Sequence, residues 1–175
     1  MKSFVIFFAL VMNLVLADAV TKEIAEHLLV SGDSFQVIPG FFDFALVHNR
    51  GCAWGLLQGQ VWPLAVFGLL AQIVLVWRRG SVFRETQDFR ILRFSALKIA
   101  EVLIHAGIAG NVIDRLCRGY VIDMFDFHWK NAWHYPCFNL ADVYICTAAG
   151  LLILSGFRNT SESCASESES HHEEI

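Results

Sequence analysis

The sequence carries little charge for its length. Only 17% of its 175 residues are charged, 55% are hydrophobic, and the mean hydropathy is +0.49. A typical soluble domain has about 25% charged residues. The composition therefore excludes an ordinary soluble domain and indicates a membrane protein. A chain this short is expected to form one domain without a separate soluble module.

The chain also lacks the residue patterns of common metal and serine-protease sites. No CxxC or cysteine–histidine ligand spacing occurs, and no Ser/His/Asp arrangement or internal repeat is found. We therefore expect no metal and no cofactor. The cysteines are interpreted as small apolar filler, and the sequence leaves open whether Cys117 and Cys137 form a disulfide.

Four apolar stretches are long enough, or nearly so, to cross about 30 Å of hydrocarbon. They cover residues 3–19, 61–77, 94–113 and 138–157. The third is the weakest, because Lys98, Glu101 and His105 interrupt it. The predicted fold class is a membrane all-α protein with a small β element, in which residues 1–158 form a single four-span domain.

Basic residues set the predicted orientation. The loop between the second and third stretches carries five arginines: Arg78, Arg79, Arg84, Arg90 and Arg93. The positive-inside rule places this loop in the cytoplasm. Both termini are then cytoplasmic, and segments 20–60 and 114–137 face the other side. Residues 159–175, rich in Ser, Glu and His, are predicted to be a disordered cytoplasmic tail.

The N-terminal stretch has a second interpretation. Lys2, an apolar core and Ala17-Asp18-Ala19 resemble a cleavable signal peptide. Cleavage would leave three spans and remove Asp18. We expect the stretch to be retained, because four spans are needed to put the arginine loop and the acidic segments described below on their proper sides.

The segment 31–57 does not have a helical pattern. Pro39-Gly40 and Asn49-Arg50-Gly51 are turn signals, and apolar and polar residues alternate between them. This predicts a small β-structure on the outer face. Its aromatic side chains are expected at the membrane interface; they are Phe41, Phe42, Phe44 and Trp54.

Acidic residues lie at the ends of the third and fourth stretches, at the same membrane face. Each has an ordinary interpretation alone: Asn139 and Asp142 as a helix cap, Asp114-Arg115 as a surface ion pair, and Asp123 as a solvated loop acid. Two carboxylates brought together in a poorly solvated place cannot both ionise easily. One can then activate a water while the other donates a proton, which predicts an aspartic dyad.

Five motifs in order give the chain a resemblance to the lipoprotein signal peptidase (signal peptidase II) family, over roughly residues 3–157. The motifs are Asp18-Ala19-Val20-Thr21-Lys22, Asn49-Arg50-Gly51-Cys52-Ala53-Trp54, Asn111-x-x-Asp114-Arg115, Val121-Ile122-Asp123 and Phe138-Asn139-x-Ala141-Asp142. The departures are Ala19 where Gln is usual, Cys52 where Ala is usual and Met124 where Phe is common.

The resemblance implies an intramembrane aspartic endopeptidase of the bacterial inner membrane, with its site at the outer face. It would cut diacylglyceryl-modified prolipoproteins just before the lipid-bearing cysteine. The resemblance assigns catalysis to Asp123 and Asp142, and the other positions follow it: orientation of the dyad by Asn111 and Asn139, substrate contacts from Asn49 and Arg115, support from Asp114, and bracing by Asp18 and Lys22. Prolipoproteins and membrane lipids are the implied partners; nucleic acid is not, and a monomer is expected.

Two other classes of protein remain open at this stage. Paired aspartates could form the relay of a small proton-coupled transporter, using Asp114, Asp123 and Asp142. Such transporters commonly show repeat symmetry or polar groups near the midplane, and neither is found here. The acids could also only cap helices in a structural membrane protein. Cleavage of a lipidated precursor separates the protease from both alternatives.

Overall fold

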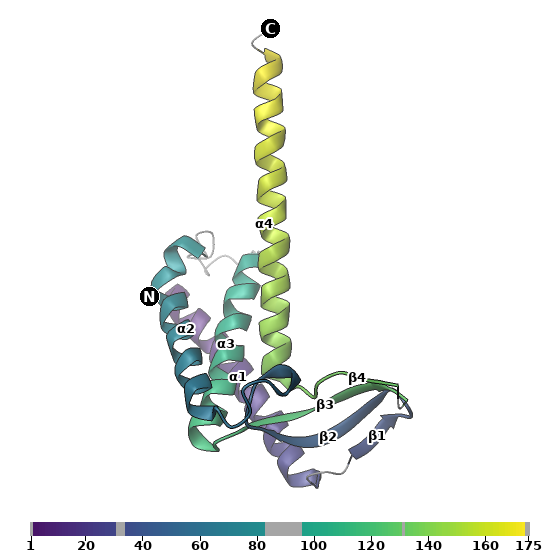
Figure 1. Cartoon of the computed structure of the whole chain (residues 1–175). Coiled ribbons are helices and arrows are strands. Elements are labelled where there is room, and N and C mark those ends of the chain that lie inside the picture. Colours follow the sequence, from purple (N-terminus) through teal and green to yellow (C-terminus); the bar gives the residue numbers. More distant parts are fainter. Residues whose placement is uncertain (1, 31–33, 83–95, 131, 174–175) are drawn as a thin grey trace.

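Four long helices and a small antiparallel sheet make up the part of the chain that the structure describes (Figure 1). The computed structural model describes residues 2–30, 34–82, 96–130 and 132–173. The helices are α1 (Lys2–Leu28), α2 (Val61–Val82), α3 (Ala96–Cys117) and α4 (Leu140–Glu173). The strands are β1 (Ser34–Ile38), β2 (Phe42–Asn49), β3 (Val121–Trp129) and β4 (Trp133–His134), and the 3-10 helix η1 (Ala53–Gly55) follows β2. The predicted fold class is confirmed.

Three helices in the described part of the chain are long and apolar enough to cross a membrane: Phe4–Leu28, Val61–Arg78 and Ala96–Cys117. The apolar part of α4, Leu140–Gly156, is shorter. Figure 1 shows the sheet at one end of the bundle, while α4 extends far beyond the other end. Arg84, Arg90 and Arg93, on which the predicted orientation largely depends, lie outside the described residues.

Helix α3 is the centre of the bundle, because α1, α2 and α4 all pack against it. Small residues allow the helices to approach closely. A Cβ on Gly107 would lie 2.5 Å from the Ala141 carbonyl oxygen of α4, and one on Gly68 of α2 would lie 2.5 Å from a methyl of Val112. Within the described ranges, α2 approaches neither α1 nor α4 closely.

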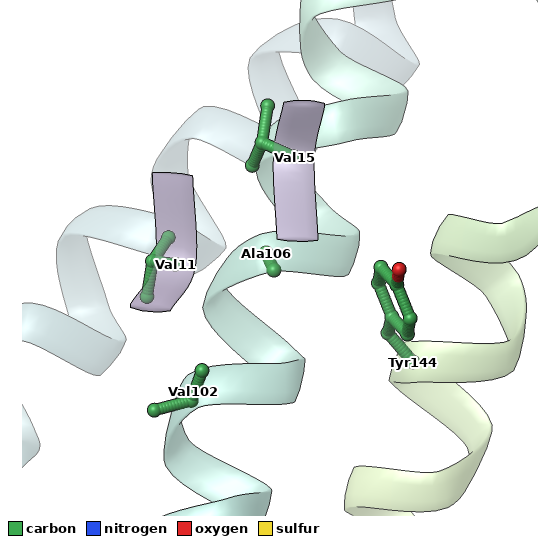
Figure 2. Close-up of a cluster of buried hydrophobic side chains, with 5 residues drawn as sticks. All are labelled: Val11, Val15, Val102, Ala106 and Tyr144. Carbon is green, nitrogen blue, oxygen red and sulfur yellow. The ribbon is translucent and has the colours of Figure 1, made fainter. Parts of the chain in front are cut away.

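A hydrophobic cluster joins three of the helices (Figure 2). It contains Val11 and Val15 of α1, Val102 and Ala106 of α3, and Tyr144 of α4, each at most 8% exposed. The close packing of these buried side chains fixes α1, α3 and α4 relative to one another.

The strands follow the order β1-β2-β3-β4 and are antiparallel. Phe42 lies opposite Phe127, and their rings stack with centroids 4.6 Å apart. A second cluster, Ala25, Leu46, Ile122 and Met124, packs the other side of the sheet against α1. The alternation in residues 42–49 therefore did predict a strand, and its apolar contacts fix the sheet to the bundle.

Two helices are longer than the apolar runs suggested. α1 continues past residue 19 to Leu28, because the charged side chains of Asp18 and Lys22 are buried and paired inside the protein. α4 continues to Glu173, through the segment predicted to be a disordered tail. No Pro or Gly occurs in residues 157–173, so no residue there breaks the helix.

Candidate active site

Asn139 and Asp142 form a reciprocal cap at the start of α4. The Asp142 backbone N–H donates to Asn139 Oδ1 over 3.0 Å, and the Asn139 N–H donates to Asp142 Oδ2 over 3.2 Å. These bonds satisfy two backbone donors that a helix start leaves open. The helix-cap interpretation is therefore correct, and it leaves Asp142 Oδ1 available for another partner.

Asp123 lies near the start of β3 and is only 2% exposed. Its Oδ2 accepts a hydrogen bond from Asn49 Nδ2 at 2.9 Å, and its Oδ1 accepts one from Asn139 Nδ2 at 2.7 Å. The interpretation of Asp123 as a solvated loop acid was wrong. A buried carboxylate needs such donors, because burying a charge without partners is costly.

Asn111 of α3 connects the two carboxylates. Its Nδ2 donates to Asp142 Oδ1 over 2.8 Å. Its Oδ1 accepts from Asn139 Nδ2 at 3.2 Å and from Lys22 Nζ at 3.1 Å. Because both donors meet the same oxygen, the amide of Asn111 can only point its NH2 group toward Asp142.

Lys22 is a fully buried cation behind the two carboxylates, with 0% exposure. Its ammonium contacts Asp18 and Asp114 at 2.7 Å each, besides the amide of Asn111. The contacts with Asp18 and Asn111 are hydrogen bonds, and the contact with Asp114 is an ion pair. Asp18 also accepts from the Ala141 backbone N–H at 2.9 Å. The predicted bracing pair thus joins α1 to α3 and to the start of α4.

Asp114 and Arg115 do not form the surface ion pair that their adjacency suggested. Asp114 contacts Lys22 and, at 3.3 Å, Arg118. Arg115 instead donates to the carbonyl oxygens of Asn111 at 3.2 Å and Gly51 at 3.0 Å. Arg115 therefore ties the turn after β2 to α3.

The same turn orients Asn49. The Gly51 N–H donates to Asn49 Oδ1 over 2.9 Å, so the NH2 group of Asn49 is directed at Asp123. Gly51 has no room for a side chain, because a Cβ would lie 2.5 Å from the Leu56 carbonyl oxygen. The Asn-x-Gly spacing in the sequence is thus explained by the geometry of this turn.

A cavity of about 960 Å³ lies in front of the two carboxylates. It is lined by Asn49, Asn111, Arg115, Asp123 and Asp142 together with mostly apolar side chains of α2, α3, α4 and the sheet. α2 and α4 form opposite walls and do not pack on each other in the described residues. An apolar cavity with a few convergent polar groups is the usual form of a binding site.

The surroundings of Asp123 favour its protonated form. Burial raises the pKa of Asp123 to about 7, and the nearby charge of Asp142 adds to this shift, while hydrogen bonds from Asn49 and Asn139 oppose it. Asp123 therefore holds a proton in weakly acidic solution. Burial also raises the pKa of the Cys137 thiol to about 12, which keeps this cavity-lining group in the unreactive thiol form.

Sequence reasoning missed several groups near the site. Arg118 was not singled out, although it lies four residues after Asp114, the spacing of ion pairs on a helix. Cys52, Cys137 and Cys146 all line the cavity. The described cysteines are free, so Cys117 and Cys137 are not paired. Among the described residues, no group of three or more His, Cys, Asp or Glu side chains could hold a metal ion.

The helix contact at Gly110 gives a test of this packing. A Cβ there would lie 2.5 Å from Asp18 Oδ2, and Lys22 and the Ala141 N–H hold that carboxylate in place. We expect Gly110→Ala to lower stability by about 1–3 kcal/mol, as overpacking does. Thermal unfolding in detergent measures this. Gly150→Ala is the matched control, because nothing lies within 4 Å of its Cβ position; equal melting temperatures for the two variants would contradict the prediction.

Comparison with known proteins places this arrangement in a family. The family model described as signal peptidase (SPase) II matches residues 10–158. The chain is 36% identical over 156 residues to a lipoprotein signal peptidase of Chromobacterium violaceum, covering 88% of this chain and 92% of that protein. It is also 36% identical over 156 residues to a lipoprotein signal peptidase of Neisseria gonorrhoeae, covering 86% of this chain and 90% of that protein.

The fold has a solved counterpart. A structure described as a bacterial membrane enzyme superposes with a TM-score of 0.76 at 29% sequence identity, covering 89% of this chain and 90% of that one. A second bacterial membrane enzyme structure gives a TM-score of 0.68 at 30% identity, covering 85% and 90%. The similarity therefore extends over nearly the whole length of these proteins.

Proposed function

The chain belongs to the signal peptidase II family, and we propose that it is an aspartic endopeptidase with Asp123 and Asp142 as its catalytic pair. As a family member it is a multi-pass protease of the bacterial inner membrane that removes signal peptides from lipoproteins. The finer proposal is that it cuts diacylglyceryl-modified precursors immediately before the lipid-bearing cysteine. Its site faces the outer side, and both termini are cytoplasmic.

The observation that carries the proposal is the linkage of two carboxylates from different elements at one cavity. Asn139 bonds Asp123, Asn111 bonds Asp142, and the two asparagines bond each other. Two acids held this way can differ in protonation, which general acid–base catalysis of amide hydrolysis requires. Membership of a protease family also argues against the transporter interpretation.

In the proposed reaction, ionised Asp142 removes a proton from water, and the water oxygen forms a bond to the scissile carbonyl carbon. Protonated Asp123 donates to the carbonyl oxygen. Collapse of the tetrahedral intermediate breaks the C–N bond: the proton taken up by Asp142 passes to the leaving amine, and Asp123 takes back a proton from a hydroxyl of the intermediate as the new carboxyl group forms. Asn49 and Arg115, at the rim of the cavity, contact the substrate backbone near the cut. The apolar walls suit a substrate that stays in the bilayer.

Cleavage of a purified precursor tests the function. The protein in detergent is incubated with a diacylglyceryl-modified prolipoprotein and, separately, with the same precursor lacking the lipid. We expect the lipidated precursor alone to be cut, with the lipid-bearing cysteine as the new N-terminal residue. An intact lipidated precursor, or cleavage at another bond, would refute the proposed reaction.

The pKa of Asp123 predicts the pH dependence. A carboxyl group with a pKa of about 7 is protonated below that pH and loses its proton as the pH rises through it. The general acid is then lost, so kcat/KM should fall above about pH 7. Replacing Asn49 with Ala removes a hydrogen bond that lowers this pKa, so the falling limb should move to higher pH in Asn49→Ala. A limb that stays in place or moves to lower pH would contradict the assignment.

A further inference from the structure

A second hollow lies on the outward surface of α1, separate from the catalytic cavity. We call it the α1 groove; it has a volume of about 460 Å³ and is lined by Ala19, Val20, Glu23, Ile24, His27, Leu28 and Arg118. None of these side chains lines the catalytic cavity. The groove spans the end of α1 nearest the sheet and the residue that follows α3.

One wall of the α1 groove is apolar and exposed. Val20, Ile24 and Leu28 line it and Leu16 extends their row beyond it, and these four side chains are 61% (Leu16), 48%, 51% and 77% exposed. Residues spaced by four form a stripe that runs along the helix, inclined to its axis. In a membrane-spanning helix, such a stripe lies against hydrocarbon chains.

The polar end of the α1 groove carries one acid and one base. Arg118 Nη2 contacts Glu23 Oε2 at 2.9 Å, and the two side chains are 27% and 52% exposed. Arg118 Nε lies 3.3 Å from Asp114 Oδ1. A guanidinium has five N–H donors, so Arg118 keeps donors for a further acceptor. Glu23 likewise keeps acceptor capacity on its carboxylate.

We infer that the α1 groove binds a phospholipid with a primary-ammonium headgroup, of the phosphatidylethanolamine type, from the outer leaflet. One acyl chain lies along the apolar stripe, the phosphate accepts from Arg118, and the ammonium donates to Glu23. Charge-assisted bonds of both kinds are strong. A glycerol headgroup brings no cation for Glu23, and a choline headgroup has no N–H to donate. The charge pattern therefore selects the primary ammonium.

Arg118 links the bound headgroup to buried side chains of the protein. Arg118 contacts Asp114, and Asp114 contacts Lys22 behind the catalytic carboxylates. A lipid that binds only the folded protein stabilises it by mass action. Binding should therefore raise the melting temperature as well as give a measurable affinity.

Native mass spectrometry tests the inference. Delipidated protein in detergent is titrated with phosphatidylethanolamine, phosphatidylglycerol or phosphatidylcholine carrying identical acyl chains. We expect the ethanolamine lipid to bind about threefold more tightly than the other two, as a partly exposed ionic contact allows. Glu23→Gln should abolish this preference while cleavage of lipidated precursor is unchanged. It should also abolish the larger rise in melting temperature with the ethanolamine lipid.

Glu26→Gln is the matched control. It removes a carboxylate from the same helix, but Glu26 contacts His48 of β2 at 3.1 Å and lies outside the α1 groove. This variant should keep the lipid preference. Equal binding of the three lipids by the unmodified protein, equal loss in both variants, or a dimer that excludes lipid would each overturn the inference.

Discussion

Asp123→Asn and Asp142→Asn should each reduce cleavage of a lipidated precursor by about 10²- to 10⁴-fold, the usual contribution of a general acid or base. Asn has nearly the shape of Asp but can neither take a proton from water nor donate one at the required strength. Initial rates with purified protein in detergent measure the loss. Thermal unfolding of the same samples shows whether the variants are folded.

Both variants should also lose some stability. Both oxygens of Asp123 and both oxygens of Asp142 accept from N–H groups, so an Asn at either position turns its NH2 toward another donor. An unsatisfied buried group costs about 1–3 kcal/mol. Asp126→Asn is the matched control, because this half-buried acid lies on the same strand but does not line the cavity. Near-normal turnover in either dyad variant, or an equal loss in the control, would contradict the catalytic assignment.

Lys22→Met should cost about 3–5 kcal/mol of stability and most of the activity. The substitution leaves Asp18 and Asp114 buried at 1% and 5% exposure without their shared cation, and breaking a buried ion pair on one side has a cost of this size. It also removes one of the two donors that orient the Asn111 amide. Unfolding and cleavage are measured on the same preparation.

Replacing Asp18 and Asp114 together with Lys22 separates the effect on stability from the effect on activity. In the triple variant Lys22→Met, Asp18→Asn, Asp114→Asn, no uncompensated charge remains in the interior. Much of the stability should return, while cleavage stays low because Asn111 still lacks the ammonium. If activity returned together with stability, Lys22 would only stabilise the fold and would not orient the dyad.

Part of this architecture could be predicted from the chain alone. The apolar runs predict the helices, since a bilayer requires that length, and the shared membrane face of the acids predicts that Asp123 and Asp142 can meet. Asn139 and Asp142 are close in sequence, so their cap follows from local rules. The ordered motifs indicate the remaining supporting positions.

The long-range partners could not be predicted in the same way. Asn49 reaches Asp123 only because of the register between β2 and β3, and a bulge between Phe44 and Val47 shifts that register. Lys22 and Asn111 are 89 residues apart in sequence, and their contact depends on how closely α1 packs against α3. α3 ends at Cys117, beyond the apolar run that stops at residue 113, because Asp114 is buried and paired with Lys22 and Arg118.

The double use of Asn139 has a kinetic consequence. Its side chain accepts from the first turn of α4 and donates to Asp123, so one residue both starts the helix and joins the acids. Helix ends normally fray faster than helix centres, but here the first turn cannot open without separating the two carboxylates. While the first turn of α4 is open, the two carboxylates are apart and the site is inactive. An inhibitor that binds Asp142 should therefore slow amide hydrogen exchange in the first turn of α4.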